Sequence, residues 1–437
     1  MGMAKTFRIE TYGCQMNVYD SAKMAALLKQ VGFGEAGSAE AADVMVINSC
    51  AVRGHAEERV LGRVAELKGM KKDRPGMVLV LAGCVAQDMG RELLERFPHL
   101  DIVVGTESYD CLPEILVDAG RDGRQVCQLN VCKTDPGRGT LPEYPGQATA
   151  MVAVMRGCDN FCSYCIVPFV RGRERSRPPD EVINEIEGLA GRGVREVTLV
   201  GQNVNSYSYA GTGFPGLLRQ AAGIEGIERV RFITSHPKDL GPELLEAMAQ
   251  EPKACEHLHL PMQSGSDRIL GLMNRRYTIG QFLEIVGKAR AAVEDLVLTT
   301  DAIAGFPGES EDEFRQTLQA MEEIRFDAAF TYKYSARRGT AAERLPGQLP
   351  DEVRQERLSS LIALQREITA ASNRRDIGRS FEVLVEKPSK QGRGQWLGRT
   401  RGNKPVAFKP AGGAGAGHII TVRIDSATTG TLIGTEL

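Results

Sequence analysis

Three cysteines in one short loop have the spacing in this chain that points most directly to chemistry. Cys158, Cys162 and Cys165 are separated by three and then two residues, in a turn rich in Gly, Asp and Asn that follows a short apolar run. Thiolates of this kind hold iron-sulfur clusters, and a cubane cluster has four irons, so three cysteines leave one iron without a protein ligand. Such an open iron can bind a substrate or a cofactor.

A structural zinc site is the alternative for this loop. Zinc in such sites takes a closed set of four ligands, and none of the six histidines lies in the loop. The spacing instead resembles the signature of the radical S-adenosylmethionine (SAM) enzymes, in which the open iron chelates the amino and carboxylate groups of SAM. The histidines at 236, 257 and 259 fall in apolar strand patterns, which favours hydrogen-bonded core residues over metal ligands.

Three further cysteines each follow an apolar run in the N-terminal third. The runs 7–11, 44–48 and 77–82 are typical of β-strands and lead to Cys14, Cys50 and Cys84. Helical patterns over 17–31 and 57–71 lie between them, and strands that alternate with helices predict a parallel sheet.

The carboxyl ends of parallel strands share one edge of the sheet, where open α/β folds place their ligands. Cys14, Cys50 and Cys84 should therefore converge, although 36 and 34 positions separate them in the sequence. The alternative is that some are ordinary buried cysteines, which behave as small hydrophobes. Since all three come just after a strand, we predict a second three-thiolate cluster site with one open iron. Cys111 is expected in the core, and no role is assigned to Cys127, Cys132 or Cys255.

Composition limits the class of protein. The chain has 437 residues, 42% of them hydrophobic, which is enough for two or three domains with cores of their own. The net charge of -2 gives no global field for nucleic acid, so any such signal must be local. The first residues lack an apolar signal core, and no run approaches membrane-spanning length. We therefore expect a cytoplasmic protein with reduced thiols and no membrane association.

The central region alternates strand and helix patterns six times. Six repeats in about 180 residues are too few for a closed eight-fold barrel of about 250 residues, so an open partial (β/α)6 barrel is predicted. Its active site should lie at the carboxyl ends of the strands, and the cysteine loop follows the first strand. The predicted strands are 152–155, 196–200, 230–234, 257–260, 297–303 and 328–332, and the predicted helices 180–189, 243–249, 279–293 and 311–324.

Small and amide residues follow several of these strands and could hold SAM. They let a cofactor approach the backbone and find donors and acceptors, and a glycine after the fifth strand could admit the adenine. Such residues are also usual in turns for conformational reasons, so each one alone is a weak indication. The prediction rests on their joint placement at the carboxyl ends of the strands. The candidates are Gly201, Gln202, Asn203, Ser235, Gln263, Ser264 and Gly305. Four arginines at 171, 173, 175 and 177 lie beside the cysteine loop, either as a solvated face or as phosphate contacts.

The C-terminal segment changes character after a long polar helix pattern over 350–375. Short strand-like runs over 381–385, 396–399, 406–408 and 418–422, with glycine turns between them, predict a small antiparallel β-barrel of a kind that binds nucleic acid. From 374 to 437 there are eleven Lys and Arg against five Asp and Glu, a local net charge of +6 that suits an RNA backbone. Trp396 could stack on a base or belong to the barrel core. With a Gly/Pro-rich linker over 133–148, the predicted domains are 1–148, 149–375 and 376–437.

Eight stretches together resemble the radical SAM methylthiotransferases over essentially the full length, and most closely the tRNA-2-methylthio-N6-dimethylallyladenosine synthases. This resemblance implies an N-terminal methylthiotransferase domain, a radical SAM core and a C-terminal RNA-binding barrel of the type called TRAM. The stretches are 11–17, 48–53, 82–87, 157–177, 259–266, 301–309, 334–340 and 398–404.

The resemblance also implies two 4Fe-4S clusters and two SAM molecules per turnover. The Cys158/Cys162/Cys165 cluster would pass an electron into SAM, giving methionine and a 5'-deoxyadenosyl radical that takes hydrogen from C2 of the target adenosine. The Cys14/Cys50/Cys84 cluster would carry or donate the sulfur, which a second SAM methylates. The target base, N6-dimethylallyladenosine at position 37 of the tRNA anticodon stem-loop, must be splayed out to reach such a pocket. The implied partners are tRNA, an electron donor such as flavodoxin or ferredoxin, and sulfur-supply proteins. The protein itself is expected to be a monomer.

Other substrates and one other class of protein are alternatives. Relatives with the same clusters modify threonylcarbamoyladenosine in tRNA or an aspartate of a ribosomal protein, and the basic C-terminal barrel argues against the protein target. The similarity over 170–177 and around Tyr334 favours dimethylallyladenosine between the two tRNA substrates. A non-catalytic RNA-binding protein that contains zinc is the alternative of another class.

Overall fold

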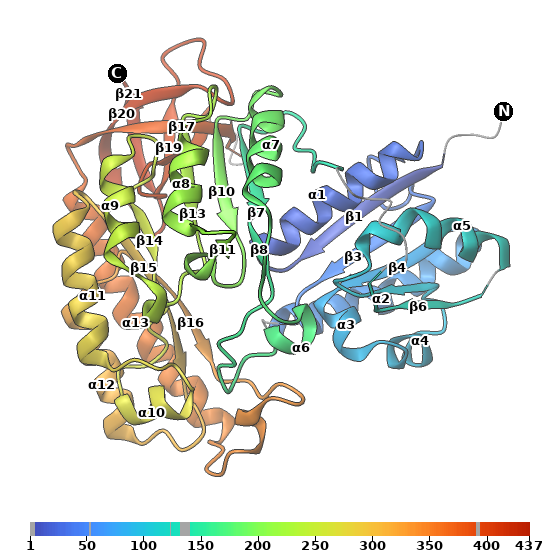
Figure 1. Ribbon diagram of the computed structural model, residues 1–437, viewed down its shortest axis with the longest axis horizontal. Helices are drawn as coiled ribbons and strands as arrows, with labels where there is room; N and C mark the ends of the chain where they lie inside the picture. Colours follow the sequence, from blue (N-terminus) through green and yellow to red (C-terminus); the bar gives the residue numbers. More distant parts are fainter. Residues whose placement is uncertain (1–4, 52–53, 123, 132–139, 390–393) are drawn as a thin grey trace. The chain divides into compact units, whose positions relative to one another are not determined.

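The computed structural model describes residues 5–51, 54–122, 124–131, 140–389 and 394–437 (Figure 1). Cys132 therefore lies outside the described residues. The chain forms two compact units: the first comprises 1–144, 156–159 and 165–174, and the second comprises 145–155, 160–164 and 175–437. Among the described residues, no helix combines the length and the apolar character needed to cross a bilayer.

The first unit is built on a six-stranded parallel sheet, as the alternating pattern predicts. The strand order is β2-β1-β3-β4-β5-β6. The central strand β3 is buried along its whole length because helices cover both faces of the sheet, with α1 and α5 packed on one face and α2 and α4 on the other (Figure 1). The strands are β1 (Thr6–Tyr12), β2 (Gly34–Glu35), β3 (Val44–Ser49), β4 (Val78–Gly83), β5 (Ile102–Val104) and β6 (Val126–Gln128).

The helices of the first unit include both predicted ones. Cys111 ends a 3-10 helix, Tyr109–Cys111, and is buried in the core as predicted. The α-helices are α1 (Gln15–Gln30), α2 (Gly54–Asp73), α3 (Cys84–Met89), α4 (Glu92–Arg96), α5 (Leu112–Asp122) and α6 (Val167–Arg171).

The second unit contains six parallel strands in two three-stranded sheets, β13-β10-β7 and β14-β15-β16. An isolated parallel bridge joins Val230 of β13 to Ala254, three residues before β14, so the two sheets continue one another as the open, partial barrel that the six repeats predict. The strands are β7 (Thr149–Ala153), β10 (Glu196–Val200), β13 (Arg229–Phe232), β14 (His257–His259), β15 (Val297–Ala304) and β16 (Ala328–Lys333).

Helices alternate with these strands, including two that the sequence reading missed. The missed helices are α8 (Phe214–Ala222) and α10 (Asp267–Leu272). Short pairs of strands, β8 (Met155–Arg156) with β9 (Arg175–Ser176) and β11 (Ser208–Tyr209) with β12 (Thr212–Gly213), lie in the connections. The other helices are α7 (Pro179–Ala190), α9 (Pro242–Gln250), α11 (Ile279–Ala292), α12 (Glu311–Ile324) and α13 (Asp351–Arg375).

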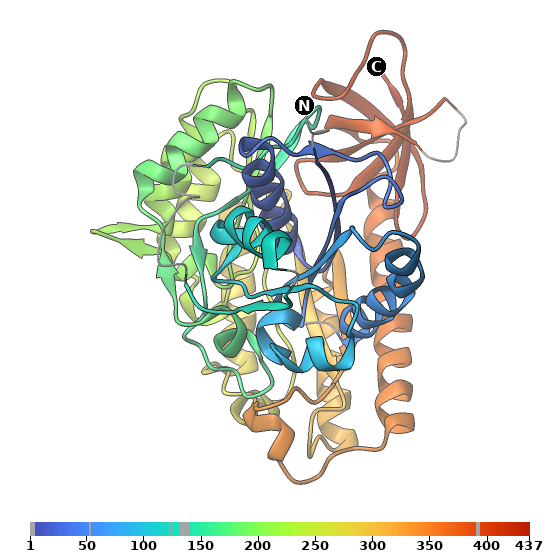
Figure 2. The same ribbon diagram turned by 90° about the vertical axis from the view of Figure 1, so that its right-hand side faces the viewer.

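The C-terminal strands close into a five-stranded barrel at the end of α13 (Figures 1 and 2). Its order is β17-β18-β19-β21-β20, and four of the five strand pairs are antiparallel. The expectation of a wholly antiparallel barrel is corrected at one pair, because β19 and β21 run parallel. Trp396 is partly buried and packs against the barrel core, which favours its core role. The strands are β17 (Ser380–Pro388), β18 (Trp396–Thr400), β19 (Pro405–Lys409), β20 (Ile419–Ala427) and β21 (Leu432–Glu436).

The turn between β18 and β19 packs against the amino ends of the central strands. Arg231 of β13 forms a buried ion pair with Glu196 of β10, at 3.1 Å between Nε and Oε1, and donates to the carbonyl of Arg401 at 2.7 Å. A Cβ on Gly402 would lie 2.4 Å from Cγ2 of Val297, so only glycine permits this approach.

Several basic residues of the C-terminal segment are therefore engaged in ion pairs within the second unit. Arg401 pairs with Glu256 at 2.6 Å, and Lys404 pairs with Asp376 at 2.6 Å. Part of the local positive charge is thus used in contacts within the chain, and the RNA contact of the remainder stays a prediction. Lys387 of β17 forms no ion pair with any described residue and remains a candidate for phosphate contact, as does Lys409 of β19.

Replacement of Arg231 by methionine is expected to destabilise the chain strongly. It would leave the Glu196 carboxylate buried without its partner, which costs about 3–5 kcal/mol. The matched control is Arg315→Met, whose ion pairs with Glu311 and Asp312 are exposed and contribute about 0–1 kcal/mol. Urea unfolding of both variants measures the difference, and equal losses would contradict the role of the buried pair.

Candidate metal-sulfur and cofactor site

Each cysteine of the N-terminal set lies directly after a strand of the first unit. Cys14 follows β1 and precedes α1, Cys50 follows β3, and Cys84 follows β4 as the first residue of α3. Cys50 and Cys84 are buried, and Cys14 is half-buried. The three thiols thus occur at the carboxyl ends of three adjacent strands, at the sheet edge that the strand pattern predicts.

Two glycines let these three connections approach each other. A Cβ on Gly13 would lie 2.8 Å from the Cβ of Cys50 and 2.3 Å from Oδ1 of Asn17. Gly83 has φ +100°, and its Cβ would lie 2.3 Å from the carbonyl oxygen of Ser49. Side chains at either position would therefore separate the loops that carry the thiols.

Buried amides and a hydroxyl link the same three connections. The amide of Asn17 donates to Oδ1 of Asn48 at 3.2 Å and to the carbonyl of Ser49 at 2.9 Å. The hydroxyl of Ser49 donates to the carbonyl of Ala82 at 2.5 Å and accepts from the backbone N–H of Val85 at 3.2 Å. These contacts fix the positions of the loops before any ligand binds. The sequence reading matched Asn17, Asn48 and Ser49 only as parts of family stretches and gave them no role.

The thiols have an electropositive neighbour. A hydrogen bond from the Cys50 thiol, opposed by burial and assisted by Arg171, lowers the pKa of Cys14 to about 6. Burial raises the pKa of Cys84, while Arg171 acts against that rise. Thiolates are the metal-binding form of cysteine, so the set suits an anionic metal-sulfur group.

The arginine run differs from the expectation of phosphate contacts. Arg171 is buried and pairs with the buried Asp20 at 2.8 Å, so it faces the interior of the first unit. Arg177 pairs with the buried Glu185 at 2.9 Å within the second unit. Arg173 is exposed and pairs with Asp159. A phosphate role for Arg171 is therefore wrong, because its guanidinium is buried and has a carboxylate partner. The phosphate role of the other three arginines stays a prediction.

The second cysteine set lies in an irregular loop, as the Gly, Asp and Asn turn predicts. Cys158, Cys162 and Cys165 are each half-buried. Gly157 has φ +76°, and a Cβ there would lie 2.0 Å from the carbonyl oxygen of Arg173. Phe161 also has positive φ, +48°, which is uncommon for a bulky residue and is found at functional sites.

A cluster and a single ion place different demands on the arrangement of their ligands. Within the part of the chain that the structure describes, no three residues among His, Cys, Asp and Glu are arranged to hold one metal ion. Zinc needs its four ligands around one centre, whereas each thiolate of a cubane cluster binds a different iron. The metal and sulfide content of the protein therefore separates the two alternatives.

The predicted SAM contacts lie at the carboxyl ends of β10, β13, β14 and β15. Three of them carry polar atoms that fit a cofactor: Asn203 Oδ1, Ser235 Oγ and Gln263 Oε1 are buried and have no hydrogen-bond partner among the described residues. Buried polar atoms are normally paired. Gln263 has φ +69° and Thr234, next to Ser235, has φ +73°, so two strand ends adopt an unfavourable backbone conformation there. Gln202 is half-buried beside them.

Three other predicted contacts serve packing between elements of the second unit. The space at Gly305 is filled by Arg354 of α13, whose Cγ would lie 2.5 Å from an added Cβ. A Cβ on Gly201 would lie 2.5 Å from Cγ of Met155. Ser264 is fully buried, with its hydroxyl 3.4 Å from that of Thr317 in α12. The adenine contact at Gly305 stays a prediction, with the side chain of Arg354 close to it.

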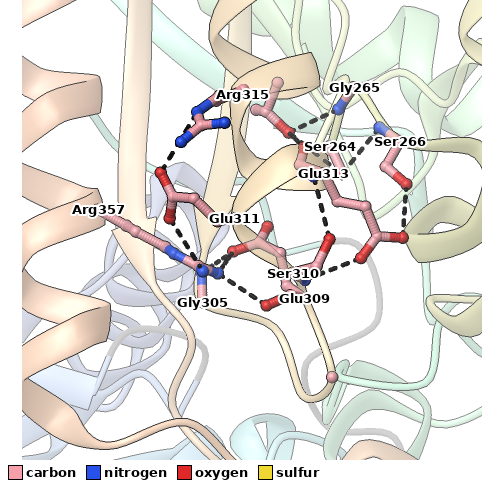
Figure 3. Close-up of polar contacts among 12 residues, drawn as sticks. Ser264, Gly265, Ser266, Gly305, Glu309, Ser310, Glu311, Glu313, Arg315 and Arg357 are labelled. Atoms are coloured by element: carbon pink, nitrogen blue, oxygen red, sulfur yellow. Dashed lines mark hydrogen bonds and ion pairs between the residues drawn. The ribbon is translucent and has the colours of Figure 1, made fainter.

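A network of carboxylates and arginines supports the connections after β14 and β15 (Figure 3). Glu309 accepts from the backbone N–H of Gly305 at 2.8 Å and pairs with the buried Arg357 of α13 at 2.7 Å. Ser266 donates to Glu313 at 3.2 Å, and Glu313 also accepts from the backbone of Ser310. These contacts fix the loops that carry Gln263 and Gly305.

The central histidines behave as the core residues that the sequence analysis favoured. Burial, and then the charge of Arg275, lowers the pKa of His236 to about 2. Burial lowers the pKa of His257 well below its usual value as well. Both rings are therefore neutral, and His236 packs edge-on against Tyr277 at 5.8 Å between ring centres.

The comparisons with known proteins identify the family. Residues 152–321 match the radical SAM superfamily, 6–105 match the uncharacterized protein family UPF0004, and 374–437 match the TRAM domain. The chain is 46% identical over 414 residues to the tRNA-2-methylthio-N(6)-dimethylallyladenosine synthase of Caldicellulosiruptor saccharolyticus, covering 93% of this chain and 88% of the relative. It belongs to this family of radical SAM methylthiotransferases.

Further relatives agree in length and name. The synthase of Syntrophotalea carbinolica is 42% identical over 98% of this chain and 99% of its own, and that of Geotalea uraniireducens is 45% identical over 93% of each. Among solved structures, the radical SAM methyltransferase TsrM of Kitasatospora setae has a TM-score of 0.57 and 15% identity, covering 78% of this chain and 74% of that one. At 15% identity this similarity shows a shared fold and does not extend to function. Members of the radical SAM family use SAM and a 4Fe-4S cluster.

Proposed function

We propose that this methylthiotransferase adds sulfur and a methyl group at C2 of N6-dimethylallyladenosine, at position 37 of tRNA. The observation that carries the proposal is the identity of 42–46% to full-length synthases of this name, together with two separate sets of three cysteines. The TRAM match supports tRNA as the substrate. Among the described residues of the barrel, we propose Lys387 and Lys409 as phosphate contacts.

The first proposed site is a 4Fe-4S cluster held by Cys158, Cys162 and Cys165, with SAM on its open iron. When bound, this group supplies the electron that cleaves SAM. Asn203, Ser235 and Gln263 would hydrogen-bond SAM through their unpaired buried atoms. The proposed contacts at Gly201, Ser264 and Gly305 are backbone or indirect ones, since packing fills the space around them. Gln202 is half-buried and could contact SAM through its side chain.

The second proposed site is a 4Fe-4S cluster held by Cys14, Cys50 and Cys84, which would carry or donate the sulfur. The linked loops of Asn17, Asn48 and Ser49 would hold its ligands in place, and the burial of Cys50 and Cys84 would restrict water. Two SAM molecules would be consumed per turnover, one for cleavage and one for the methyl group.

The proposed domains are 1–148, 149–375 and 376–437, and the matched ranges 6–105, 152–321 and 374–437 support this division. We propose a cytoplasmic monomer that receives electrons from a flavodoxin or ferredoxin and sulfur from dedicated supply proteins.

Nucleoside mass spectrometry of tRNA tests the substrate. In a strain that lacks this chain, the methylthiolated nucleoside should disappear and N6-dimethylallyladenosine should accumulate, and the intact gene should restore the product. Loss of methylthiolated threonylcarbamoyladenosine instead would contradict the proposed substrate while leaving the chemistry intact.

A further inference from the structure

One buried arginine of the second unit contacts a cysteine of the proposed SAM-binding loop. Nη1 of Arg275 lies 3.5 Å from Sγ of Cys162, within the range of an N–H···S hydrogen bond. The same guanidinium donates to the carbonyl of Pro261 at 2.9 Å and, through Nε, to the hydroxyl of Tyr277 at 3.2 Å. Arg275 is 4% exposed, and its three contacts fix the direction of the guanidinium.

The segment around Arg275 also holds the cysteine loop by its backbone. The amide of Asn274 donates to the carbonyls of Asn160 and Phe161, at 3.1 and 3.0 Å. Ser163 donates from its backbone N–H to Met273 at 3.0 Å and from its hydroxyl to the carbonyl of Leu272 at 2.7 Å. Asn274 and Arg276 both have φ +57°, so an unfavourable local backbone accompanies this attachment.

The charge of Arg275 lacks a compensating carboxylate. Among the described residues it forms no ion pair, and the titratable groups that act on it include Tyr277, Tyr164 and Cys162, while Arg275 in turn acts on His236. Arg171, beside the N-terminal cysteine set, differs in this respect because the carboxylate of Asp20 neutralises its charge. An unpaired buried charge is costly unless an anion accompanies it. An iron-sulfur core with thiolate ligands is such an anion, and hydrogen bonds to its sulfurs set its reduction potential.

We propose that Arg275 is a positioning residue that donates to the Cys162 sulfur and raises the reduction potential of the proposed cluster. This inference rests on the proposed function, since it takes Cys162 as an iron ligand. One electron from a low-potential donor converts the oxidised cluster to its reduced form and adds one negative charge, and a fixed positive charge nearby stabilises that reduced form.

A redox titration tests the effect of the charge. The full chain carries Cys14→Ala, Cys50→Ala and Cys84→Ala, so that a single cluster can form, and dithionite with viologen mediators supplies the electrons. Arg275→Gln should lower the ratio of reduced to oxidised cluster about tenfold at a fixed potential, which corresponds to about 59 mV for one electron. Arg275→Lys should remain near the parent, and Arg276→Gln, which alters an exposed neighbour, should have no effect. An unchanged ratio in Arg275→Gln, or an equal shift in Arg276→Gln, would overturn the proposal.

A second measurement does not depend on Arg275→Gln, the variant that removes the charge. When arginine is labelled with nitrogen-15 in its guanidinium, pulsed electron paramagnetic resonance of the reduced cluster should show a nitrogen coupling. Arg275→Lys should lose this coupling and Arg276→Lys should keep it. A coupling that persists in Arg275→Lys, or that is missing from the parent, would contradict the contact. Absence of about four irons from the parent would instead overturn the proposed function.

Discussion

Replacement of Cys158 by alanine is expected to abolish cleavage of SAM, reducing it to the level given by the reductant alone. The loop would keep two of its three proposed thiolate ligands, which do not retain a cubane cluster with an open iron. The iron content should fall by about four atoms per chain. Anaerobic incubation with dithionite, followed by chromatographic measurement of methionine released from SAM, gives the rate.

Cys255→Ala is the control for this variant. Cys255 lies in the second compact unit and is buried, and it belongs to neither proposed site. Its replacement should leave both cleavage and iron content near wild type. Cleavage of SAM by Cys158→Ala at the wild-type rate would contradict the assignment of this loop.

Replacement of Cys14 by alanine should stop formation of the methylthiolated product without stopping SAM cleavage. SAM cleavage should persist, because the Cys158/Cys162/Cys165 loop is intact, while the methylthiolated nucleoside should fall below detection. The iron content should again fall by about four atoms per chain. Mass spectrometry of digested tRNA and the methionine assay on the same reaction separate the two effects.

Cys127→Ala is the matched control in the same sheet, since Cys127 is half-buried in β6 and lies outside the three linked loops. It should form product normally. Product formation by Cys14→Ala at the wild-type rate would show that the N-terminal cysteines do not supply the sulfur.

Much of the fold follows from local sequence patterns. The buried run 44–48 predicts β3 to within one residue, and the capped helix after Ser310 is predicted over its full length. Helix α8, of nine residues, was missed, although α9 of the same length was predicted. The alternation of apolar and polar residues along a strand indicates which face is buried, but not which strand it pairs with or in which direction. The parallel pairing of β19 with β21 was therefore not predicted.

The site was predictable where chemistry is carried by residue type and spacing, and less so where it depends on tertiary contact. The strand-end rule placed Cys14, Cys50 and Cys84 at the sheet edge. The same rule gave Gly305 a cofactor role, although Arg354, distant in sequence, fills that space. A run of arginines gives no sign that Arg171 turns inward to Asp20, because the partner lies 151 positions away. Arg275 was missed for the same reason, since its contact with Cys162 spans 113 positions.

The central claim is that one chain holds two metal-sulfur cores, each on three thiolates. Analysis of iron, acid-labile sulfide and zinc in anaerobically purified protein tests it most directly. The account predicts about eight irons and about eight sulfides per chain, as two four-iron clusters require, with negligible zinc. Zinc without sulfide would contradict it and favour a non-catalytic RNA-binding protein.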